Sequence, residues 1–134
     1  MAKKIVAFVC IHNSCRSQMA EGWAKLLGSD VLEVYSAGTE EYPGPKAMAI
    51  EVMEDAGVDM SLHTSKLLSD IPKELDILVT MGCGVECPFV PTQHREDWGL
   101  EDPSGGPKSG FEETRDIIKE KVLELIKRVK DGKL

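Results

Sequence analysis

The fold is decided by the stretch Ile5-Val6-Ala7-Phe8-Val9-Cys10-Ile11-His12-Asn13-Ser14-Cys15-Arg16-Ser17. Its first five residues are all apolar, which is typical of a strand buried on both faces of a parallel sheet. Apolar residues at helical spacing follow from Met19 to Leu27. The segment between them, residues 10–17, therefore lies where a buried strand turns into a helix.

Such a turn directs backbone N–H groups and the positive end of a helix at one point, which favours a tetrahedral oxyanion. Cys10 places a thiol at the mouth of this turn, where the helix N-terminus and Arg16 favour the nucleophilic thiolate. Arg16 can hold two anion oxygens in a fork, and the Ser17 hydroxyl can donate to the sulfur anion. The residues expected to surround the anion are Ile11, His12, Asn13, Ser14, Cys15 and Arg16.

Length and composition predict a single globular domain over residues 1–134, with 42% hydrophobic and 29% charged residues. No apolar run reaches membrane-spanning length, and no signal peptide precedes the first strand. The four cysteines are therefore expected to be reduced thiols of a cytoplasmic protein. A net charge of −7 argues against nucleic acid or an anionic membrane as a partner, so affinity for an anion must come from local donors.

The rest of the chain alternates between strand and helix patterns. Further strands are predicted at 31–36 and 75–81, with a short polar edge strand within 93–100, and further helices at 45–56, 67–71 and 111–129. Ser17 is expected to cap the first helix, Gly28 to end it and Gly57 to end the second. This alternation indicates an α/β fold with a parallel sheet covered on both faces. Ligands bind beyond the carboxyl ends of such strands, so the loops carrying Cys10, Cys83 and Asp102 are expected at one edge.

Residues 10–17 resemble the C-x5-R-S loop of the low-molecular-weight tyrosine phosphatases, and the run from Cys10 to Gly22 is more similar to the arsenate reductases built on the same fold. The further matches are Tyr35-Ser36-Ala37-Gly38, Pro45-Lys46-Ala47, His63-Thr64-Ser65, Val79-Thr80-Met81, Trp98-Gly99 and Asp102-Pro103. The resemblance implies a three-layer α/β fold with a four-stranded parallel sheet of flavodoxin-like topology. It also implies reduction of arsenate to arsenite, with electrons from thioredoxin, in a monomer without a cofactor.

The resemblance also assigns roles to individual residues. Cys10 attacks arsenic while Asp102 donates a proton to the departing oxygen. Cys83 then attacks the Cys10 sulfur, and Cys87 attacks Cys83 to free Cys10. Gly82 and Gly84 are expected to give this segment its backbone freedom. Phosphate and sulfate should bind at the same place as arsenate analogues.

Two departures from the family stand out. Cys83 and Cys87 are closer in sequence than in better-known thioredoxin-coupled members, so a glutaredoxin or a low-molecular-weight thiol is an alternative donor. Some members bind potassium through four side chains, of which Asn13, Glu21 and Ser36 match here. The fourth position holds Lys66, whose ammonium can take the place of the cation. Little dependence on potassium is therefore expected.

Three alternatives remain open. A low-molecular-weight tyrosine phosphatase would use Cys10, Arg16 and Asp102, although Ser104 follows Asp102-Pro103 where such phosphatases carry tyrosine. A non-catalytic oxyanion or redox sensor would not need a proton donor such as Asp102. A zinc site at Cys83 and Cys87 is disfavoured because the four-residue spacing is unusual for zinc and only three histidines are available, so no metal is expected.

Overall fold

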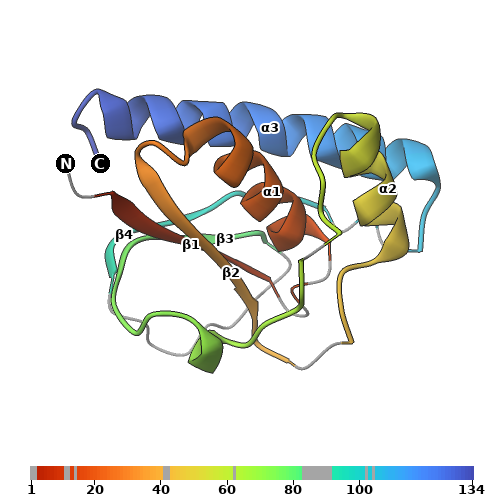
Figure 1. Ribbon diagram of the computed structural model, residues 1–134, viewed down its shortest axis with the longest axis horizontal. Helices are drawn as coiled ribbons and strands as arrows, with labels where there is room; N and C mark the ends of the chain where they lie inside the picture. Colours follow the sequence, from red (N-terminus) through yellow and green to blue (C-terminus); the bar gives the residue numbers. More distant parts are fainter. Residues whose placement is uncertain are drawn as a thin grey trace.

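A computed structural model describes residues 3–10, 13, 15–40, 43–61, 63–82, 92–101, 103 and 105–134. Its strands are β1 (Lys4–Cys10), β2 (Leu32–Gly38), β3 (Leu75–Thr80) and β4 (Thr92–Asp97). Its helices are α1 (Arg16–Gly28), α2 (Ala47–Asp55) and α3 (Lys108–Lys130), with one 3-10 turn, η1 (Leu68–Asp70). The strands pair in parallel in the order β2-β1-β3-β4, which confirms the predicted four-stranded, flavodoxin-like α/β fold (Figure 1).

The sheet is built around β1, whose residues 6–9 are fully buried. Side chains of a strand alternate between the two faces. Val6 and Phe8 pack into the larger cluster with α1 and α3, whereas Ala7 and Val9 pack with Ile71 below η1. Figure 1 shows α1 and α3 stacked over one face and η1 beneath the other. The continuous apolar run in β1 therefore reflects burial on both faces, as the sequence predicts.

Most elements lie where they are predicted, but β2 continues to Gly38, α2 begins at Ala47 rather than at Pro45, and the helix predicted at 67–71 is the 3-10 turn η1. Three further corrections concern the helix ends. Ser17 does not cap α1, because the N-cap is Cys15, without a capping side-chain hydrogen bond. Gly28 does not end α1 in a left-handed conformation. It is the last helical residue, and a Cβ there would lie 2.7 Å from the Cδ1 of Ile126. Glycine at this position lets α3 pack closely on α1.

The third correction concerns α3, which begins at Lys108 rather than near Phe111, with Pro107 as its N-cap. Proline fits the start of a helix because the first N–H groups have no partner within it. The prediction for α2 is confirmed at its end, where Gly57 adopts φ +88° and its N–H donates to the Glu54 carbonyl. No helix in the described ranges combines the length and apolar character needed to cross a membrane.

Candidate active site

The site begins where β1 ends and α1 starts. Cys10 is 3% exposed, and its Sγ lies 2.9 Å from the Oγ of Ser17 in the first turn of α1. Asn13 donates from Nδ2 to the same Ser17 oxygen at 2.9 Å. Because the serine oxygen already accepts this bond, its own hydrogen is available to the sulfur. The Ser17 hydroxyl is therefore placed to donate to the Cys10 sulfur.

Asn13 holds the shape of the loop. Its φ of 52° is left-handed, a conformation that asparagine adopts more readily than most residues. It is fully buried, and its Oδ1 accepts hydrogen bonds from the backbone N–H of Lys66 at 2.8 Å and from Gln18 at 2.9 Å. Its carbonyl accepts from Ser65 at 2.8 Å. These bonds tie the loop to the segment that follows residue 62.

Gln18 is the second organising residue, and the sequence interpretation missed it. Its Nε2 lies 2.9 Å from the Asn13 carbonyl, the Asn13 Oδ1 and the Thr64 carbonyl. Its Oε1 lies 2.9 Å from the Nδ1 of His63. The only available signal was a polar residue in the first turn of a helix, next to residues 10–17. His63 is thus a hydrogen-bonding residue beside the loop.

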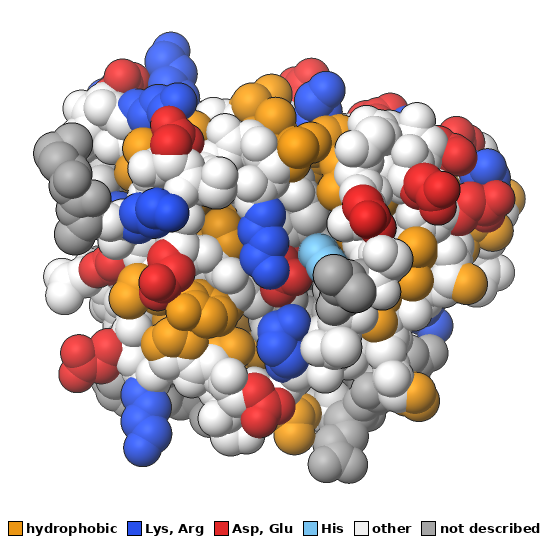
Figure 2. Space-filling model, in the orientation of Figure 1, with side chains coloured by type: hydrophobic (Ala, Val, Ile, Leu, Met, Phe, Trp, Pro, Cys, Tyr) orange, Lys and Arg blue, Asp and Glu red, His pale blue; other side chains and the backbone are white. Residues whose placement is uncertain are grey.

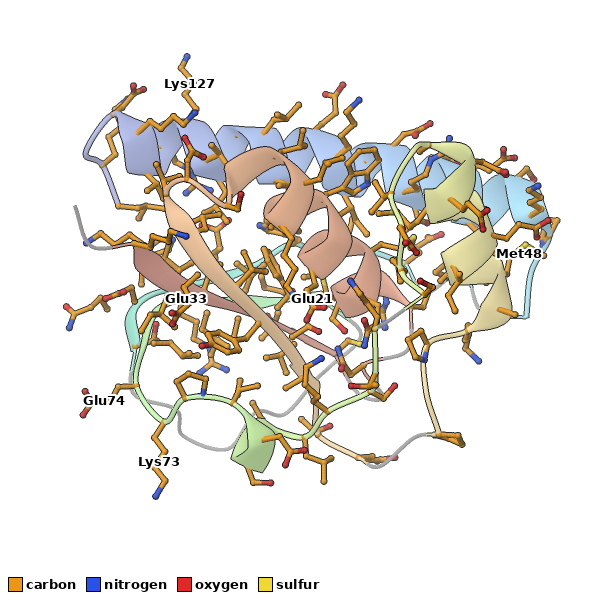
Figure 3. All side chains as sticks on the ribbon, in the orientation of Figure 1. Glu21, Glu33, Met48, Lys73, Glu74 and Lys127 are labelled. Atoms are coloured by element: carbon orange, nitrogen blue, oxygen red, sulfur yellow. The ribbon has the colours of Figure 1, made fainter. Side chains whose placement is uncertain are left out.

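Glu21 is a buried carboxylate one turn further along α1 (Figure 3). Burial raises its pKa, but the Ser36 hydroxyl, which donates at 2.7 Å, and the positive charges of Lys66 and Lys25 together outweigh burial and bring the pKa below its usual value. Its oxygens lie 3.4 Å from the Lys66 ammonium, 3.3 Å from the Lys25 ammonium and 3.1 Å from the His63 ring. Lys66 thus supplies a cation beside Glu21, as its position in the sequence suggests.

Burial lowers the pKa of His63 most strongly, and Lys25 and Lys66 lower it further against the opposing charges of Glu21 and Asp59. The ring is therefore neutral at pH 7. Both neighbours of its Nδ1, the Gln18 Oε1 and the Glu21 Oε2, are acceptors. This assigns the proton to Nδ1.

Arg16 connects α1 to the exits of two strands. Its Nη1 donates to the carbonyl of Met81, just after β3, at 3.2 Å and to the carbonyl of Leu100, after β4, at 2.9 Å. The guanidinium is 4% exposed. These two hydrogen bonds fix the orientation of the guanidinium. A guanidinium held in one orientation is suited to recognition of an oxyanion. These two carbonyls carry no sequence signal, since any residue supplies them.

The structure brings together Cys10, Asn13, Cys15, Arg16 and Ser17 at the carboxyl edge of the sheet. Within the described part of the chain, the cysteines Cys10 and Cys15 are both buried. The other predicted site residues lie outside the described residues: Ile11, His12, Ser14, Cys83, Gly84, Cys87, Asp102 and Ser104. Gly82 is described: its φ is +93° and it closely approaches the Gly99 backbone, while its role in giving the segment backbone freedom stays a prediction.

The net charge of −7 gives no general attraction for an anion. Figure 2 shows acidic and basic side chains interspersed, with acidic groups gathered over α2 and the neighbouring part of α3. Lys108 is engaged there with Glu51 and Asp55. Among the described residues there is no group of three or more His, Cys, Asp or Glu side chains able to hold a metal ion. Binding of an anion at residues 10–17 therefore depends on the local donors.

Comparison with known proteins agrees with this geometry. The model of the family "Low molecular weight phosphotyrosine protein phosphatase" matches residues 5–133. An arsenate reductase of Staphylococcus aureus (strain Newman) is 48% identical over 123 residues, which cover 89% of this chain and 93% of that protein. Arsenate reductase 2 of Staphylococcus haemolyticus is 45% identical over the same shares.

Solved structures give the same result. An arsenate reductase in the phosphate binding state superposes with a TM-score of 0.86 at 41% identity, covering 94% of this chain and 98% of the other. A thioredoxin-dependent arsenate reductase of Corynebacterium glutamicum superposes with a TM-score of 0.80 at 28% identity, covering 97% of this chain and 63% of the other. The chain belongs to the low-molecular-weight phosphotyrosine protein phosphatase family, and within it to the group of the arsenate reductases.

Proposed function

We propose that this protein reduces arsenate to arsenite, with Cys10 as the nucleophile. The observation that carries this proposal is the buried Cys10 Sγ at 2.9 Å from the Ser17 hydroxyl, at the N-terminus of α1 and in a chain nearly half identical to an arsenate reductase. A thiolate stabilised in this position attacks the arsenic of a bound oxyanion. Arg16 and the backbone N–H groups of the loop hold the anion oxygens.

The first step forms a sulfur–arsenic bond and breaks an arsenic–oxygen bond. In our proposal the departing group is a hydroxyl of the arsenate, which takes one proton from Asp102 and leaves as water. The proline at position 103 restricts the backbone of Asp102, which helps to hold the acid in one place. Arsenic is still pentavalent in the resulting Cys10 adduct.

Reduction occurs in the second step. The Cys83 thiolate attacks the Cys10 sulfur, and the electron pair of the sulfur–arsenic bond passes to arsenic, which leaves as arsenite. A Cys10–Cys83 disulfide remains. Cys87 then attacks Cys83, which releases the Cys10 thiolate and leaves a Cys83–Cys87 disulfide. A dithiol protein such as thioredoxin reduces this disulfide, so two electrons enter for each arsenate reduced. We further propose that the protein acts as a monomer in the cytoplasm.

The test is a coupled assay with arsenate, NADPH, thioredoxin reductase and thioredoxin, repeated with a glutaredoxin system and with glutathione alone. Cys10→Ser and Cys83→Ser should release no arsenite. Cys87→Ser should release about one arsenite per enzyme and then stop, with a Cys10–Cys83 disulfide visible by peptide mass mapping. Sustained turnover by Cys83→Ser would contradict the relay.

A phosphatase is the second candidate, favoured by the family itself and by the shared Cys10, Arg16 and Ser17 arrangement. We expect weak hydrolysis of an aryl phosphate, because phosphate and arsenate share their charge and shape. This side activity should survive in Cys83→Ser and Cys87→Ser, since a phosphocysteine needs only water to turn over. An enzyme with strong aryl phosphatase activity and no arsenate reduction would overturn the proposed function.

A further inference from the structure

The segments that follow β3 and β4 approach each other closely at Gly82 and Gly99. This contact between Gly82 and the Gly99–Leu100 backbone is called the crossing. A Cβ on Gly82 would lie 2.9 Å from the Cα of Gly99, 3.0 Å from the nitrogen of Leu100 and 3.1 Å from the carbonyl carbon of Gly99. All three atoms are backbone, so no flexible side chain can move aside. Gly82 also has φ +93°, which disfavours any other residue. Both space and conformation therefore require glycine at position 82.

Hydrogen bonds fix this crossing. The N–H of Trp98 donates to the Thr80 carbonyl at 2.8 Å, and the N–H of Leu100 donates to the Met81 carbonyl at 2.9 Å. Met81 and Leu100 are also the residues whose carbonyls accept from Arg16 Nη1. One guanidinium nitrogen thus bridges the two strand exits at the point where they touch.

We propose that Gly82 is a positioning residue for oxyanion binding, acting through Arg16. The close approach at Gly82 sets the spacing of the two carbonyls, and the two carbonyls set the direction of the guanidinium. A side chain at position 82 would push the Gly99–Leu100 backbone away and draw the Leu100 carbonyl from its place. The fork of Arg16 would then miss the anion oxygens, and a bidentate contact tolerates little misalignment. This inference rests on the proposed function only in taking Arg16 as an anion ligand.

Gly57 provides a matched control. It has φ +88°, and no described heavy atom lies within 4 Å of a Cβ built on it. Gly57→Ala carries the same kind of conformational strain as Gly82→Ala, at the end of α2 and without a close approach.

The experiment measures the affinity for inorganic phosphate by calorimetry, which needs neither the relay cysteines nor a reductant. Gly82→Ala should raise the dissociation constant about tenfold or more, by the sensitivity of bidentate recognition to sub-ångström shifts. Gly57→Ala should lower the urea midpoint and leave the dissociation constant within about twofold. A Gly82→Ala protein with a lowered urea midpoint and unchanged phosphate affinity would overturn the proposal.

A second measurement uses the unaltered protein, in case Gly82→Ala does not fold. If the crossing favours anion binding, then bound anion must favour the crossing to the same extent. Saturating phosphate should therefore slow hydrogen exchange at the Leu100 amide more than at the Val58 amide, which bonds to Met53 beyond the end of α2. Equal protection at both amides would overturn the proposal. Phosphate binding without arsenate reduction would instead count against the proposed function and leave the role of Gly82 intact.

Discussion

Ser17 is the side chain best placed to affect the reactivity of Cys10. Its hydroxyl accepts from Asn13 and lies 2.9 Å from the Cys10 sulfur. A hydrogen bond to a charged group contributes about 1.5–3 kcal/mol. Ser17→Ala should therefore slow alkylation of Cys10 by iodoacetamide at pH 7 by about 10- to 100-fold, because each 1.4 kcal/mol corresponds to about tenfold. Peptide mass spectrometry identifies the alkylated cysteine.

The control for this prediction is Ser61→Ala, which removes an exposed hydroxyl outside the site. Its rate of Cys10 alkylation should equal that of the wild type. If Ser17→Ala were alkylated as fast as the wild type, the serine would be a packing residue and the thiolate would depend on the helix N-terminus and Arg16 alone.

At the residue scale, the sequence identifies residues whose side chains have a characteristic chemistry. Cys10, Arg16 and Ser17 could be assigned because a thiol, a guanidinium and a hydroxyl at this spacing have few other uses. Gln18 could not, because an amide in the first turn of a helix is usually a surface residue. The Met81 and Leu100 carbonyls could not either, since the chain crossing that brings them to Arg16 depends on tertiary structure.

At the element scale, Glu96 joins the edge strand β4 to α3. Arg128 of α3 donates to both of its oxygens, at 2.9 and 3.0 Å, and Trp98 Nε1 donates at 2.6 Å. Its other neighbour is His94 Nε2 at 2.7 Å. Burial raises the pKa of Glu96, but the hydrogen bonds from Arg128, Trp98 and His94 outweigh it and hold the pKa at about 2. A polar edge strand thus gains a charged anchor on the helix.

Because the pKa of Glu96 is lowered in the folded state, its stabilisation is complete above the unfolded value of 4.5 and is lost as the pH falls towards 2. A shift of this size corresponds to about 3 kcal/mol. Glu96→Gln should lower the free energy of unfolding at pH 7 by about 2 kcal/mol, since glutamine keeps part of the hydrogen bonding. Urea titrations at pH 7, 5, 4 and 3 should show the difference from wild type shrinking below pH 5.

Glu120→Gln on the exposed face of α3 is the control, and it should show no such pH-dependent difference. A constant difference between Glu96→Gln and wild type from pH 7 to pH 3 would mean that packing, rather than charge, accounts for the loss.

The elements themselves were predictable because their signals are local. The apolar run of β1, the polar alternation of β4 and the stop at Gly57 all follow from neighbouring residues. The position of the end of α1 was predicted, but the role of Gly28 there was not. Gly28 allows close contact with Ile126 of α3, which is nearly a hundred residues away in sequence. A glycine near a helix end has the same appearance in both cases. Only the packing partner distinguishes a left-handed cap from a close approach.

At the scale of the whole molecule, the buried Glu21 and its cations decide how the protein responds to its ionic surroundings. The Lys66 ammonium lies 2.9 Å from the Thr64 carbonyl and 3.4 Å from Glu21 Oε1, and its side chain is 26% exposed. The adjacent Asn13 Oδ1 and Ser36 hydroxyl complete a set of oxygens around Glu21 and the loop. A cation that binds only the folded state stabilises it in proportion to its occupancy. With Lys66 already beside Glu21, replacing sodium by potassium should shift the thermal midpoint by less than about 1 °C.

Replacing the lysine should create the dependence that the wild type lacks. Lys66→Asp removes the internal ammonium and adds a second carboxylate near Glu21, and hard cations prefer oxygen ligands. The variant should be destabilised in sodium chloride by repulsion between the carboxylates. Potassium at ten times its dissociation constant should restore about 1.4 kcal/mol of folding free energy, seen as a rise in the thermal midpoint of about 3–5 °C.

Lys25→Met is the matched control, because Lys25 pairs with the same carboxylate from a side chain that is 52% exposed. It should be indifferent to the choice of cation, since Lys66 remains beside Glu21. A large potassium effect on the wild type, or none on Lys66→Asp, would show that the lysine ammonium does not occupy the place of a cation.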